Sequence, residues 1–190
     1  MRRFLLLVVT IASLALPAGA LAGGGNYAFD GGTKAQRAQV RAALGASTFD
    51  WNVVPTLVEI HIKRDIPTQA TPGHIWLDAR LVSSGRFAWA AIQDEYAHQV
   101  DFSRFDAATR QRLTGELGAR DWCYGVAGLN HAEYGCERFA STLVWAFWPS
   151  KDNAYRPTSS SDESAAMPAP QFRTLVTSLL GIGNPFAVRR

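Results

Sequence analysis

Four residues whose side chains can bind a metal ion or move protons lie close together in one stretch of the chain: Asp94, Glu95, His98 and Asp101. Apolar residues around them recur at the three- and four-residue spacing of a buried helix face: Ala88, Ala91, Ile92 and Phe102. Glu95 and His98 fall on that face, and Asp94 precedes His98 by one helical turn. Burying these groups is costly unless a partner such as a metal ion compensates them. The pattern indicates a buried polar site; the alternative is a surface Asp94–His98 pair contributing about 0.3 kcal/mol.

The string Asp94-Glu95-Tyr96-Ala97-His98 resembles the zinc-peptidase motif H-E-x-x-H, in which two histidines one turn apart bind zinc and the glutamate activates a water. The resemblance is to the zincins, with one departure: Asp94 stands at the first histidine position. It implies that Asp94 and His98 are ligands of Zn²⁺ and that Glu95 is the general base.

A third ligand must come from another part of the chain. In the gluzincin branch of the zincins it is a glutamate on a later helix, followed one turn on by a small residue, and Glu137-Arg138-Phe139-Ala140 is similar to that element. The resemblance implies Glu137 as the third ligand, with His131 and Asp101 as alternatives. It further implies that His131, Tyr134 or Tyr155 steadies a developing oxyanion, and that Asp101 orients a ligand or a neighbouring backbone group.

The aspartate at position 94 leaves two functions open. Its oxygen reaches less far from the helix than an imidazole nitrogen, and two carboxylates beside one histidine favour harder ions such as manganese or calcium. One expectation is therefore an exported metallopeptidase that hydrolyses peptide bonds in a peptide or protein substrate. The other is a catalytically silent zincin homologue that acts as a secreted binding or structural protein.

The expected fold is α+β: a small, mainly antiparallel sheet beside the motif helix, followed by a helical portion. Residues 57–62 and 74–78 alternate as strands, with Val58, Ile60 and Ile62 inward. In zincins a strand like 74–78 is the edge strand along which an extended peptide pairs. His61 is interpreted as a solvated strand residue, with a metal-binding role as the less favoured alternative.

The remaining elements follow from caps and periodicity. A glycine-rich lead-in over 23–32 is expected to be loose, and 49–54 is short and β-prone. Helices are expected over 34–44 with a Thr33 cap, 86–102 with a Ser84 cap, 106–117, 131–148 and 171–180. Residues 156–170, rich in Ser and Pro, are expected to form a mobile loop.

The first 22 residues combine a basic start, a short apolar run and an A-x-A end, which predicts a signal peptide and one exported domain over 23–190. No later run approaches a membrane span. The formal net charge of +3 is carried by arginines at the two ends, so nucleic-acid binding is not expected. Cys123 and Cys136 are the only cysteines, and in an oxidising compartment they most simply form one disulfide.

Overall fold

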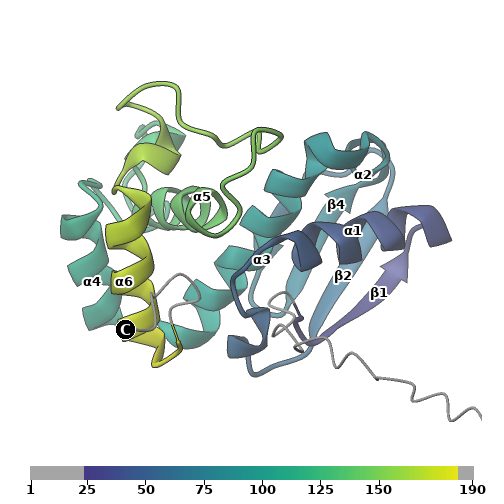
Figure 1. Ribbon diagram of the computed structural model, residues 1–190, viewed down its shortest axis with the longest axis horizontal. Coiled ribbons are helices and arrows are strands. Elements are labelled where there is room, and N and C mark those ends of the chain that lie inside the picture. The colour runs from purple at the N-terminus through teal and green to yellow at the C-terminus, as the bar shows by residue number, and fades with distance from the viewer. Residues whose placement is uncertain (1–23, 184–190) are drawn as a thin grey trace, which may run out of the picture.

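One four-stranded mixed sheet lies at one side of the computed structural model, which describes residues 24–183 (Figure 1). The predicted signal peptide, 1–22, lies outside these residues. The strands stand in the order β1-β2-β4-β3, and their bounds are β1 Tyr27–Gly31, β2 Val58–Lys63, β3 Gln69–Thr71 and β4 His74–Asp78. β1 and β4 run parallel to β2, and only β3 runs antiparallel to its neighbour β4.

The expectation of a mainly antiparallel sheet is therefore wrong, and the reason lies at the start of the domain. The lead-in expected to be loose contains β1, and α1 (Lys34–Ala46) crosses over from β1 to β2. Such a crossover connection makes the two strands parallel. The alternation predicted for 58–62 is confirmed, because Val58, Ile60 and Ile62 are buried against the helices.

Helices cover one face of the sheet and then form a second layer of their own. The other α-helices are α2 Ala79–Ser83, α3 Trp89–Arg104, α4 Ala107–Glu116, α5 Gly135–Phe147 and α6 Ala169–Leu180. Short 3₁₀ turns are η1 Trp51–Val53, η2 Gly85–Ala88, η3 His131–Glu133 and η4 Glu163–Ala165. Figure 1 shows α1 and α3 beside the sheet, with α4, α5 and α6 gathered at the other end of the molecule.

The predicted caps are confirmed at some helix ends and not at others. Thr33 and Gln36 form a reciprocal capping box at the start of α1, which confirms the predicted Thr33 cap. Gly181, directly after α6, ends that helix in the left-handed conformation, with φ of 66°. Ser84 makes no capping hydrogen bond to the motif helix, because the turn η2 separates it from α3. The segment 49–54 contains η1 and no strand.

The segment α3–α5 positions the polar site. α5 is buried on nearly all sides, and its Phe139, Leu143 and Phe147 join one apolar core with residues of α1, α3, α6 and the sheet. α3 packs along α5, so residues on their facing sides meet. Across residues 24–183, no helix is both long enough and apolar enough to span a membrane.

The predicted disulfide joins Cys123 to Cys136, with the two Cα atoms 5.5 Å apart. It ties the loop before η3 to the first turn of α5, directly before Glu137. Because the bond closes a short loop, replacing both cysteines with serine is expected to lower the free energy of unfolding by about 3 kcal/mol, measured by urea denaturation. An unchanged unfolding midpoint would contradict a stabilising role for this bond.

Candidate metal centre

α3 brings Asp94, Glu95 and His98 to a cavity between the sheet edge and the helical layer. Of the two polar residues expected on the apolar stripe, His98 is only 8% exposed and Glu95 is half-buried, and the neighbouring Asp94 is 7% exposed. With Glu95 they line a cavity of about 550 Å³. The cavity is also lined by β3 and by Tyr124, His131, Glu137 and Tyr155.

Glu137 reaches the same place from the first turn of α5. Its Oε2 lies 3.3 Å from His98 Nε2 and 3.2 Å from His131 Nε2. Its Oε1 accepts a hydrogen bond of 2.7 Å from the Tyr124 hydroxyl. Asp94 Oδ2 lies 3.8 Å from His98 Nε2. The three ligand residues expected from the zincin resemblance are therefore brought together from α3 and α5.

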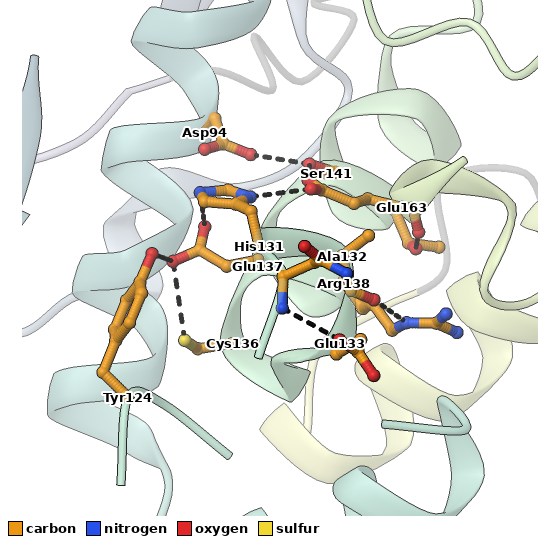
Figure 2. A network of polar contacts seen from close by, with 12 residues as sticks. Asp94, Tyr124, His131, Ala132, Glu133, Cys136, Glu137, Arg138, Ser141 and Glu163 are labelled. Carbon is orange, nitrogen blue, oxygen red and sulfur yellow. Dashed lines mark hydrogen bonds and ion pairs between the residues drawn. The ribbon is translucent and has the colours of Figure 1, made fainter. Parts of the chain in front are cut away.

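Two further polar residues, Ser141 and Glu163, complete the network (Figure 2). The Ser141 hydroxyl lies 3.2 Å from Asp94 Oδ1 and 3.2 Å from Glu163 Oε2. Glu163 Oε1 lies 2.7 Å from His131 Nδ1, so the His131 ring bridges Glu137 and Glu163. In Figure 2 this ring stands between the Asp94 and Glu137 carboxylates.

Sequence reasoning missed Tyr124, Ser141 and Glu163. Glu163 belongs to the segment 156–170, where no periodicity marks a site. The turn η4 places it, and Asp162 Oδ2 holds the preceding residues by accepting hydrogen bonds from the Thr158 and Ser159 backbone amides. The one available signal was Glu163 itself, an acidic residue inside a Ser-rich run.

The other predicted residues take different positions. Asp101 is buried and accepts hydrogen bonds from Arg110 Nε at 2.8 Å and from the Trp122 indole, so these two side chains, rather than a ligand, hold its carboxylate. The Tyr134 hydroxyl donates to the Val126 carbonyl at 2.8 Å and so points into the loop. Of the three oxyanion candidates, His131 and Tyr155 line the cavity.

Burial and crowding of like charges shift the protonation of this site. Burial, with the nearby Glu137 and Glu163 charges, raises the pKa of Asp94 to about 7. Burial and the Asp94 charge raise the pKa of Glu95 to about 8. Burial alone would lower the pKa of His98, but its hydrogen bond to Glu137 and the Asp94 charge raise it to about 9. In the metal-free site, protons therefore compensate part of the carboxyl charge, and a bound cation would take their place.

Two of the separations between candidate ligand atoms fit a small metal ion. With bonds of about 2.0–2.1 Å in tetrahedral geometry, two ligand atoms lie about 3.3 Å apart. The His98–Glu137 and His131–Glu137 separations match this, and Asp94–His98 is half an ångström longer. One group of three possible ligand residues at this site has its ligand atoms all within 4.8 Å of one another. Among the described residues, that group is His98, Cys136 and Glu137.

Cys136 is not available as a thiolate, because its sulfur is in the disulfide. His98 and Glu137 are therefore already placed as a ligand pair. The third ligand would be Asp94 or His131, and because neither joins His98 and Glu137 in a trio within 4.8 Å, its side chain would have to move toward them.

Comparison of the chain with protein-family models, curated proteins and solved structures gives no match.

Proposed function

We propose that this protein is an exported, zincin-like metallopeptidase in which Asp94, His98 and Glu137 hold a zinc or related divalent ion. The observation that carries the proposal is the meeting of His98 Nε2 and Glu137 Oε2 at 3.3 Å, from two helices, in a cavity that Glu95 also lines. The disulfide accords with an oxidising compartment.

The bound ion would polarise the scissile carbonyl and acidify a water molecule. Glu95 would accept the proton of the attacking water and deliver it to the leaving amine. A neighbouring cation favours the ionised carboxylate, so it would lower the Glu95 pKa from its metal-free value of about 8 and prepare it as a base. His131 and Tyr155 line the same cavity and would donate hydrogen bonds to the developing oxyanion.

The position of β3 supports a peptide substrate. The sequence suggested 74–78 as the edge strand, but β4 lies between β2 and β3, and β3 is the edge. Gln69, Ala70 and Thr71 of β3 line the cavity. An extended peptide would pair with the outer edge of β3 and place its scissile bond near Glu95.

A silent binding protein is the second candidate, and the Asp94 geometry favours it. Asp94 is not a member of the compact trio of ligand atoms, and its carboxylate already accepts a hydrogen bond from Ser141. A protein with this network would keep its fold and cavity without hydrolysing a bond.

Metal content tests the proposal. Elemental analysis of the purified proteins measures the zinc content. His98→Ala and Glu137→Gln are each expected to contain one equivalent of zinc less than wild type, because each substitution removes a ligand. Glu116→Gln is the matched control, since Glu116 lies on α4 and pairs with Arg112. Loss in Asp94→Ala but not in His131→Ala would identify Asp94 as the third ligand. Full zinc content in His98→Ala would overturn the proposed centre.

A further inference from the structure

A second group of metal-binding side chains lies on the outer face of the sheet, away from α3. Because side chains alternate along a strand, Glu59 and His61 of β2 and His74 of β4 point opposite to the buried Ile60 and Ile75. The parallel register places Glu59 directly beside His74, and it places His61 beside Asp30 of β1. Strand order thus gathers residues from three strands.

The ligand atoms of this group are close enough to share one ion. His61 Nε2 and His74 Nδ1 are 3.1 Å apart. Glu59 Oε2 lies 3.9 Å from His61 Nε2 and 3.6 Å from His74 Nδ1. All three atoms lie within 4.8 Å of one another, near the separation of about 3.3 Å that bonds of 2.0–2.1 Å produce.

Asp30 orients the more buried histidine. Its Oδ2 lies 2.8 Å from His61 Nδ1, and it is also paired with Lys63. A proton on Nδ1, donated to this carboxylate, leaves the lone pair of Nε2 facing His74 and Glu59. A carboxylate that fixes a histidine in this way is the usual partner of a metal-binding imidazole.

Aromatic packing holds both rings in place. The rings of His61, His74 and Trp76 are nearly parallel, with Trp76 centred 5.2 Å from His61 and 5.5 Å from His74. The ligands stand on paired strands rather than loops, so their positions are set by the sheet. The side chains of His74 and Glu59 are 44% and 47% exposed, which leaves the site open on the solvent side.

We propose that Glu59, His61 and His74 form a second metal site, which binds a divalent transition ion of the zinc type. Two imidazoles and one carboxylate suit zinc, copper or nickel and do not suit calcium or magnesium. The exposed fourth position is taken by water or by a donor group of another molecule. This site is independent of the proposed peptidase centre, because it lies on the opposite face of the sheet and shares no ligand with it.

The test uses His98→Ala protein, in which the first centre is removed, titrated with zinc chloride by calorimetry. One equivalent of zinc is expected to bind. In a separate titration, nickel chloride is expected to quench the fluorescence of Trp76, and this quenching should be absent in Trp76→Phe. His74→Ala and Glu59→Gln should each weaken zinc binding at least about tenfold, and Asp30→Asn about 10–100-fold. The matched control Glu116→Gln should leave affinity unchanged.

Three results would overturn the second site. The first is that the His98→Ala protein does not bind zinc. The second is that His74→Ala leaves the zinc affinity unchanged. The third is that an equal concentration of calcium displaces the zinc. If His98→Ala does not fold, the same zinc titration is done on wild type and on His74→Ala. Wild type should bind two equivalents of zinc and His74→Ala one. A wild type that binds one equivalent, lost in His74→Ala, would support this site and count against the peptidase centre.

Discussion

Glu95→Gln is expected to lower peptide hydrolysis by about 10²–10⁴-fold while the metal content stays unchanged. The amide occupies the same space in the cavity but cannot accept a proton from water. Glu95 is not a proposed ligand, so the metal should remain bound. The fold should also be kept, because the raised pKa of about 8 means that Glu95 is mostly neutral at pH 7 in the metal-free protein, as glutamine is.

The measurement is mass-spectrometric detection of cleavage products from a broad peptide panel, with wild type, Glu95→Gln and the control Glu116→Gln at equal zinc content. Glu116 is a surface residue of α4, so its variant should cleave like wild type. Equal cleavage by wild type and Glu95→Gln would remove Glu95 from the mechanism. Zinc binding without cleavage in any of the three proteins would favour the silent binding protein.

Local signals in the sequence predicted the elements that carry the site. The alternation of 58–62 and 74–78 gave strands with the correct inward residues, and Thr33 marked the start of α1. The polar residues on the stripe of α3 indicated a buried site, and Glu137 was found by its similarity to a known element. Each of these features depends on neighbours within a few residues.

Strand order and loop position were not predictable in the same way. β1 is a short strand between glycines, and its pairing depends on β2, which offers it a parallel edge. The interpretation of His61 as a solvated strand residue did not foresee its hydrogen bond to Asp30, which requires β1 beside β2. Glu163 approaches His131 through a turn whose position depends on packing against α5. Long-range pairing decides these contacts.

The metal-free protein is expected to lose more than about 3 kcal/mol of unfolding free energy between pH 5 and pH 8, because Asp94 alone accounts for about 2–3 kcal/mol and Glu95 and His98 act in the same direction. Asp94 has a folded pKa of about 7, above its ordinary value of 3.8, so folding favours its neutral form and stability falls as pH rises between those values. Glu95 acts in the same direction up to about pH 8. His98, with a folded pKa of about 9, contributes stability below pH 6.5 that is lost as pH rises toward 9. Asp30, with a pKa of about 2, titrates below this window.

Urea denaturation in EDTA at pH 5, 6, 7 and 8 measures this slope. Asp94→Asn should reduce the loss of unfolding free energy between pH 5 and pH 8 by about 2–3 kcal/mol, because asparagine does not ionise. The control Asp106→Asn, at the exposed cap of α4, should leave this loss unchanged. Zinc at 100 times its dissociation constant should restore about 2.7 kcal/mol at pH 8. It should restore less at pH 5, since protons then compete for His98 and the carboxylates. A metal-free protein that is as stable at pH 8 as at pH 5 would contradict the buried, charge-crowded site on which the proposed metal centre depends.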